Sequence, residues 1–201
     1  MRAVRERDTE PVALHDRALE NIAFIRDTME RTTRFTAVSG TGGIVIGVVA
    51  LAASALAWQQ SDPGAWLAVW LAAATASFIT SGVFIALKAR RADVPLLRGP
   101  GRKFLLSLLP SILVGAALTG PLFLAGEVRL LPAVWLLLYG AAVMAAGAFS
   151  VPAIPVMGLC FLVVGAAALF APVGTGDLFM ATGFGAVHVV FGIIVRARYG
   201  G

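Results

Sequence analysis

Hydrophobic residues gather into six long runs along this chain, and short polar connections separate them. Each run is about as long as the roughly 20-residue helix that crosses the hydrocarbon core of a bilayer. The pattern predicts an all-α, polytopic membrane protein. Its six transmembrane helices are expected at residues 35–58, 65–87, 104–125, 130–149, 151–171 and 178–195.

Composition agrees with a membrane location, because 59% of the residues are hydrophobic and only 13% are charged. A soluble domain carries about twice that share of charged residues. The runs divide the chain into an arm at 1–34, a transmembrane domain at 35–195 and a tail at 196–201. The first run is too long, and lies too far from the first residue, to be a cleaved signal peptide.

The sixteen Lys and Arg residues predict the orientation, because cytoplasmic loops retain positive charge. Seven precede the first run, six lie between the second and third, and two follow the last. Arg129 is the one basic residue expected on the opposite side of the membrane. We therefore expect a protein of the bacterial inner membrane with both termini in the cytoplasm, and short outward turns near Asp62, Glu127 and Asp177.

The loop between the second and third runs carries most of the unbalanced charge. The seven basic residues of the arm are matched by seven acids, whereas the loop has Asp93 alone against six bases. Such a cluster attracts anionic headgroups by about 1 kcal/mol per basic residue. Retention of positive charge in the cytoplasm is the simpler explanation of the same cluster. Nucleic acid is not an expected partner. The predicted lipid contacts are Lys88, Arg90, Arg91, Arg98, Arg102 and Lys103.

Short identities between runs predict that the six helices form three repeated hairpins. The letters AVWL at 68–71 recur at 133–136, and VGAA at 114–117 recurs at 164–167. A fixed register of this kind is the signature of an internal repeat.

The last predicted hairpin resembles the repeat of the HdeD-like bacterial membrane proteins. The resemblance rests on GAAALFAP at 165–172, a short turn, and a second helix ending in FGII at 191–194. It covers residues 43–195 and implies six spans in three hairpins. That group is associated with acid stress in enteric bacteria. The resemblance implies no catalytic residues.

The arm from Asp16 to Arg34 is predicted to form an amphipathic cytoplasmic helix. Asp16 is placed to cap it, and Leu19, Ile22 and Met29 recur at helical spacing. Its apolar face is open to three interpretations, namely attachment to the lipid surface, packing against the bundle, or docking of a soluble protein partner.

Small residues favour close contact between helices in several of the runs. Gly43 and Gly47 form a small-xxx-small pair in the first run, and Gly183 and Gly185 interrupt the last. Such residues serve packing inside one chain, association into a homo-oligomer, or a hinge around a substrate.

His188 is the one ionisable residue deep inside a predicted span, and such residues are functional candidates by default. It relays a proton or binds a polar ligand in one interpretation. In the other, it is a neutral imidazole that fixes packing. Its predicted hydrogen-bond partners are Ser77, Thr80, Ser81 and Tyr139.

The sequence contains no constellation that indicates an enzyme, a metal site or a bound cofactor. Metal binding needs several converging ligands, yet His15 is predicted to be cytoplasmic, His188 intramembrane, and Cys160 is the single cysteine. We expect a non-enzymatic structural or regulatory protein whose arm or basic loop contacts a partner or anionic lipid. The alternative is a small-molecule or proton-linked carrier or channel with a polar path at His188.

Overall fold

The computed structural model describes residues 17, 19–22, 25, 34–93 and 96–200. The chain divides into two compact units, Met1–Arg34 and Phe35–Gly201. In the first unit, the described residues before Arg34 are helical and exposed. The predicted cap Asp16 and the apolar Met29 lie outside the described residues.

The second unit is all-α in its described part. Five of its helices are long and apolar enough to cross a membrane, and a sixth apolar helix, α6, has 17 residues. These helices are those of a multi-pass membrane protein. The elements are α2 (Gly40–Ala57), α3 (Pro63–Arg91), α4 (Gly99–Leu124), the 3-10 turn η1 (Val128–Leu130), α5 (Leu131–Gly147), α6 (Ala153–Leu169), α7 (Gly176–Met180), the π-helix η2 (Ala181–Val187) and α8 (His188–Tyr199).

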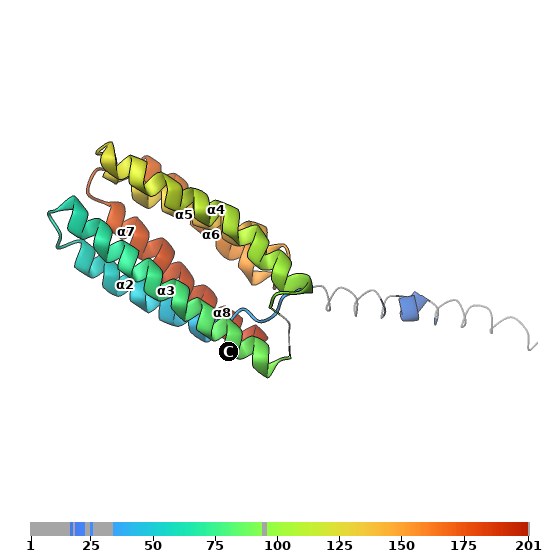
Figure 1. The fold of residues 1–201 in the computed structure, drawn as a ribbon. Helices are drawn as coiled ribbons and strands as arrows, with labels where there is room; N and C mark the ends of the chain where they lie inside the picture. The colour runs from blue at the N-terminus through green and yellow to red at the C-terminus, as the bar shows by residue number, and fades with distance from the viewer. Residues whose placement is uncertain (1–16, 18, 23–24, 26–33, 94–95, 201) are drawn as a thin grey trace, which may run out of the picture. The chain divides into compact units, whose positions relative to one another are not determined.

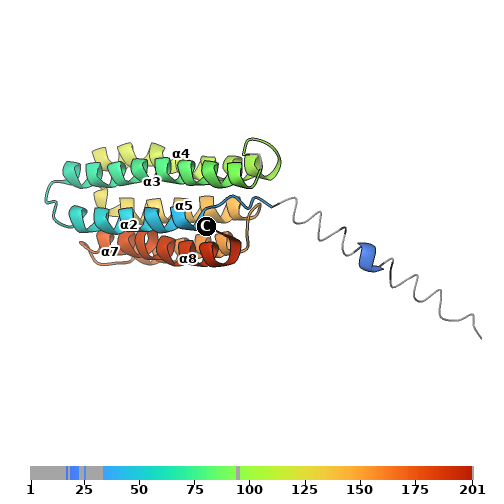
Figure 2. The same ribbon diagram turned by 90° about the horizontal axis from the view of Figure 1, so that it is seen from below.

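The helices of this unit lie in two layers (Figures 1 and 2). The first layer contains α2, α3 and the continuous helix α7–η2–α8, with α2 packed between its neighbours. The second contains α4, α5 and α6, with α5 packed between its neighbours. The layers meet where α6 faces α7, η2 and α8 and where α5 faces α7. Helices α3 and α4 pack mainly against α2 and α5 of their own layers and form the outer edges.

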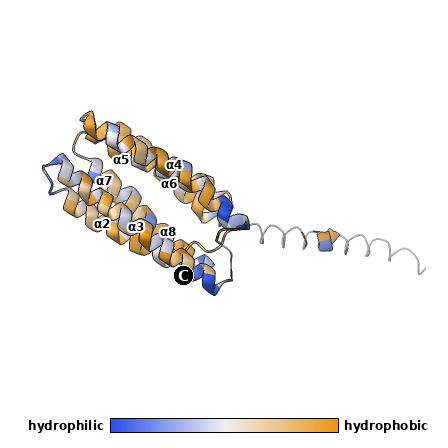
Figure 3. Cartoon of the chain, viewed as in Figure 1, coloured by the Kyte–Doolittle hydropathy of each residue, from blue (hydrophilic) through white to orange (hydrophobic). Residues whose placement is uncertain are grey.

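The connections between helices lie at the two opposite ends of these layers. We call the end with the connections 58–62, 125–130 and 170–175 the short-turn end. The opposite end contains residues 35–39, 92–93, 96–98 and 148–152 and the end of α8, and we call it the basic end. Figure 3 shows hydrophobic colour along the helices and hydrophilic colour toward their ends.

The first predicted span begins at Phe35, but α2 begins only at Gly40. The reason is that Phe35 bonds to a distant segment, its N–H donating to the Phe149 carbonyl at 2.7 Å. In return, the Ser150 hydroxyl donates to the Phe35 carbonyl at 2.8 Å. Ser39 then caps α2 by accepting the Gly42 N–H at 3.1 Å.

Within each layer, glycines let helix backbones touch. A Cβ atom at Gly192 of α8 would lie 2.7 Å from the Ile44 nitrogen and 2.8 Å from the Gly40 oxygen. In the other layer, a Cβ at Gly158 of α6 would lie 2.8 Å from the Gly140 oxygen. We call these contacts the α2–α8 seam and the α5–α6 seam.

The predicted pair of small residues in α2 belongs to the first seam. A Cβ at Gly47 would lie 2.7 Å from the Gly185 oxygen, and one at Gly43 would lie 3.3 Å from the Gly192 Cα. Both glycines therefore serve packing inside this chain, which is one of the three roles predicted for them.

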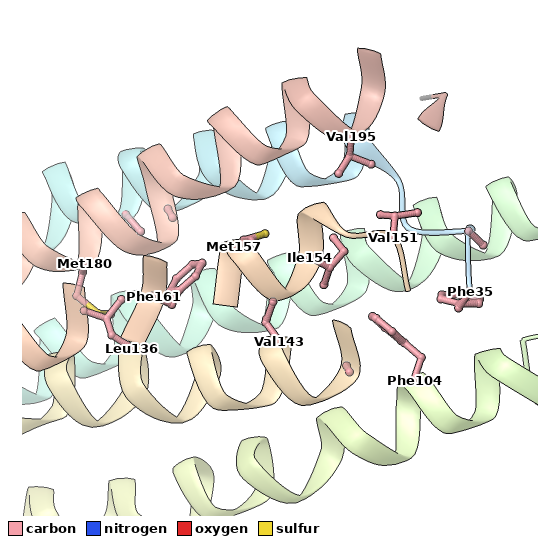
Figure 4. Packing of buried hydrophobic residues seen from close by; sticks show 14 of the residues in the cluster. Phe35, Phe104, Leu136, Val143, Val151, Ile154, Met157, Phe161, Met180 and Val195 are labelled. Carbon is pink, nitrogen blue, oxygen red and sulfur yellow. The ribbon is translucent and has the colours of Figure 1, made fainter. Parts of the chain in front are cut away.

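Where helices of the two layers pack together, side chains rather than backbones make the contact. Phe161 and Leu136 are fully buried from the second layer, and Met180 lies against them from the first (Figure 4). Toward the basic end, Val195 and Val151 continue the same core. The outer edges instead leave large apolar side chains exposed, since Phe78 of α3 is 69% exposed and Leu113 of α4 is 63% exposed. Such apolar surface is what lipid would cover.

Candidate functional site

A buried polar pair joins the two layers near the middle of the bundle. His188, the first residue of α8, is 4% exposed. Its Nε2 atom lies 2.8 Å from the hydroxyl oxygen of Tyr139 on α5. Its Nδ1 atom lies 3.0 Å from the carbonyl oxygen of Phe184, one turn earlier in η2. Both ring nitrogens therefore have partners, which satisfies the polar groups at this depth.

Aromatic rings enclose this pair. The Phe161 ring lies 4.8 Å from the Tyr139 ring and 5.2 Å from the His188 ring, with an edge-on geometry in each case. Phe184 closes the group at 5.1 Å from Tyr139. The π-helix η2 ends immediately before His188. Such helices are rare, and they occur frequently at functional sites.

The structure brings one of the four predicted partners to His188. Tyr139 bonds to it, but Ser77, Thr80 and Ser81 lie on α3, which packs against α2. All three hydroxyl residues are half-buried, and neither ring nitrogen of His188 uses them. The polar path predicted from these residues therefore reduces to the pair His188 and Tyr139.

The basic end presents most of the predicted lipid contacts to the surroundings. All of them except Lys88 are exposed, and the end of α8 adds two further exposed arginines. Asp93 is the acid in the described part of the α3–α4 connection. The exposed basic residues are Arg90, Arg91, Arg98, Arg102, Lys103, Arg196 and Arg198.

Lys88 has a different role from the one predicted for it. Its ammonium group donates to the carbonyl oxygens of Val38 and Tyr199, each at 3.0 Å, and also to that of Gly200. Lysine near a helix C-terminus satisfies carbonyls that have no partner within the helix. Lys88 thus ties the end of α8 to α3 and to the segment before α2.

The short-turn end contains a polar cluster that the sequence reasoning missed. Asp177 of α7 accepts two indole N–H bonds at its Oδ1 atom, from Trp66 at 2.9 Å and from Trp70 at 3.0 Å. The Ser54 hydroxyl donates to the Asp177 main-chain carbonyl at 2.9 Å. The available signal was an acid in each outward turn together with tryptophans one helical turn apart at 66 and 70.

An open cavity of about 440 Å³ lies beside this cluster, and both layers contribute to its walls. Asp62, Trp66 and Asp177 line it from the first layer, and Arg129 and Pro132 from the second and the turn before it. The Trp66 ring stacks on that of Trp135, with centroids 5.8 Å apart and planes 9° apart. This volume falls within the range of about 300–1,000 Å³ typical of small-molecule pockets.

Metal-binding clusters of three or more His, Cys, Asp or Glu side chains are absent from the part of the chain that the structure describes. Comparison with known proteins adds no family: no family model, no curated protein and no solved structure matches this chain.

Proposed function

We propose that this chain is a six-span protein of the bacterial inner membrane with both termini in the cytoplasm. A helix of 17 residues is about 25 Å long, and the apolar residues that flank α6 supply the remaining length of a span. The sided distribution of basic residues supports a cytoplasmic basic end. The resemblance to HdeD-like proteins supports the arrangement as three hairpins.

The proposed role is structural or regulatory, without catalysis, and its central interaction is with anionic lipid. One observation carries this proposal: seven exposed Arg and Lys side chains surround one end of an apolar bundle. Each basic residue close to an anionic surface contributes about 1 kcal/mol. The basic end would therefore hold lipid headgroups of the cytoplasmic leaflet.

Retention of lipid tests this role directly. Native mass spectrometry would compare the wild-type protein with a variant carrying Arg90→Gln, Arg91→Gln, Arg98→Gln and Arg102→Gln, both loaded with phosphatidylglycerol. The control is Arg129→Gln, because Arg129 is exposed at the other end. We expect fewer bound lipids only in the fourfold variant. Equal retention in all three proteins would contradict the proposal.

A proton-linked carrier or channel is the second candidate, and the bond between His188 and Tyr139 favours it. This bond joins α5 of one layer to α8 of the other, with 2.8 Å between the Tyr139 hydroxyl and His188 Nε2. A movement that separates the two layers would break it. Proteoliposomes with a trapped pH dye would report proton flux. Loss of flux in His188→Ala, with flux retained in Ser77→Ala, would support this candidate, whereas unchanged flux in His188→Ala would exclude it.

The arm would dock a cytoplasmic protein partner. The described residues of the arm support this docking, because Leu19, Ile22 and Ile25 are helical and exposed. Deletion of residues 1–33 is expected to abolish co-purification of a partner. The bundle itself would form a homo-oligomer. Stoichiometry from native mass spectrometry tests the homo-oligomer.

A further inference from the structure

We propose that the cavity at the short-turn end binds a small organic cation, such as an alkylammonium or guanidinium compound. The carboxylates of Asp62 and Asp177 would hold the charge, and the face of Trp66 would hold the alkyl groups. This site lies at the opposite end from the proposed lipid contact, so the two proposals stand or fall separately.

The charges around the cavity favour a cation. Two acidic side chains line it, Asp62 and Asp177, together with one base, Arg129. The base is already paired, since its Nε atom lies 3.5 Å from Glu127 Oε2, and Glu127 is not part of the lining. The lining is therefore left with a net negative charge, and a cavity with low-dielectric walls focuses such a field onto its contents.

Asp177 is held in place before any ligand arrives. Two indole N–H groups converge on Oδ1, and among the described residues none donates to Oδ2. Tryptophan supplies hydrogen bonds but no positive charge, so the bonds position the carboxylate without neutralising it. Asp62 is fixed in a similar way, because its Oδ2 atom accepts the Ala65 N–H at 2.7 Å as the cap of α3.

Trp66 adds a rigid aromatic wall to this pair of acids. Its ring is held by the bond to Asp177 and by stacking on Trp135. A cation within about 6 Å of an indole face gains about 0.5–2 kcal/mol, and quaternary ammonium groups are the ligands best suited to that interaction. Carboxylate, indole face and cavity volume thus describe one chemical class of ligand.

The competing explanation is that Asp177 only fastens α7 to α3. It accounts for the two indole bonds, and capping of α3 accounts for Asp62, but neither contact accounts for the cavity that both acids line. Asparagine distinguishes the explanations, because it keeps an oxygen that accepts the indole N–H groups while removing the charge. At position 62 asparagine also remains a good helix cap.

Binding of choline to the full chain in detergent tests the site, measured by calorimetry and by tryptophan fluorescence. We expect saturable binding to the wild type and an increase in Kd of about tenfold or more in both Asp62→Asn and Asp177→Asn. Asp93→Asn is the control, since it removes an acid at the basic end that neither lines the cavity nor pairs with a residue that does. It is expected to leave Kd unchanged.

Three outcomes would overturn the proposal. They are the absence of saturable choline binding to the wild type, equal binding by the wild type and Asp62→Asn, and tighter binding of acetate than of choline. Thermal melting of each variant guards against misfolding. If Asp177→Asn does not fold, the result with Asp62→Asn decides, because its cap at α3 is retained.

Discussion

The contacts within each layer differ in kind from the contacts between the layers. Along the α2–α8 and α5–α6 seams, glycines bring backbone against backbone, as at Gly192 with Gly40 and at Gly158 with Gly140. Between the layers, bulky side chains such as Phe161 and Met180 meet, with the hydrogen bond of His188 and Tyr139 among them.

This difference indicates where the molecule resists change and where it tolerates it. Backbone atoms cannot move aside without displacing a whole helix, whereas side chains in a core adopt other rotamers at modest cost. We infer that each layer behaves as a rigid body and that relative movement is concentrated between the layers. The expected effects of substitution follow this order.

Adding one methyl group at a seam should produce the largest effect. Gly192→Ala places a Cβ 2.7 Å from the Ile44 nitrogen, and Gly158→Ala places one 2.6 Å from the Met144 nitrogen. Overpacking costs about 1–3 kcal/mol, and we expect the upper part of that range because the opposing atoms are backbone. Unfolding in mixed micelles with increasing dodecyl sulfate measures the loss.

Gly82→Ala is the matched control for both seams. Gly82 lies on the outer edge formed by α3, and a Cβ there meets nothing within 4 Å. We expect unchanged stability or a gain of about 0.5–1 kcal/mol, because alanine favours the helix. Equal losses at Gly82, Gly192 and Gly158 would show that the seams have no special rigidity.

Removing the ammonium group of Lys88 should produce a smaller loss, confined to the first layer. Lys88→Met keeps the unbranched stem of the side chain but leaves the carbonyls of Val38 and Tyr199 without this donor. Hydrogen bonds to charged groups contribute about 1.5–3 kcal/mol, and water at the basic end replaces part of that. Hydrogen exchange should rise at the end of α8.

Lys103→Met serves as the comparison for Lys88, since Lys103 is exposed and its ammonium lies 5.8 Å from the centre of the Phe149 ring. Exchange at the end of α8 is expected to stay at the wild-type level in this variant. A similar rise in both variants would mean that net charge, rather than the bonds of Lys88, holds the helix end.

The smallest loss should follow from breaking the polar bond between the layers. Tyr139→Phe removes the hydroxyl 2.8 Å from His188 and keeps the ring contacts with Phe161. Hydrogen bonds between transmembrane helices average about 0.6 kcal/mol. We expect the layers to stay folded while exchange in η2 increases. A loss larger than that at the seams would contradict the distinction between rigid layers and a tolerant interface.

Length and hydrophobicity made the helices predictable, but not their neighbours. The hydropathy pattern locates each helix because the bilayer requires uninterrupted apolar length. It does not reveal that Phe35 bonds to Phe149, because this pairing joins segments far apart in the chain. The helix therefore begins later than its apolar run.

The candidate sites were predictable to different degrees for the same reason. His188 stands out in the sequence because a single ionisable residue in an apolar run is conspicuous. Its partner depends on which helix α8 faces, so Tyr139 could not be separated from Ser77 by sequence alone. Asp177 was missed because a carboxylate in a turn looks solvated until Trp66 and Trp70 are placed beside it.

The π-helix η2 sets the rotational phase between the two ends of the last span. Each residue of an α-helix turns the chain by about 100°, and the wider π-turn holds extra residues within the same span. The number of residues in η2 therefore sets the directions in which Asp177, before it, and His188, after it, point toward their separate partners. Deleting Ala181 would keep Asp177, Phe184 and His188 and would still turn either Asp177 or His188 away from its partner.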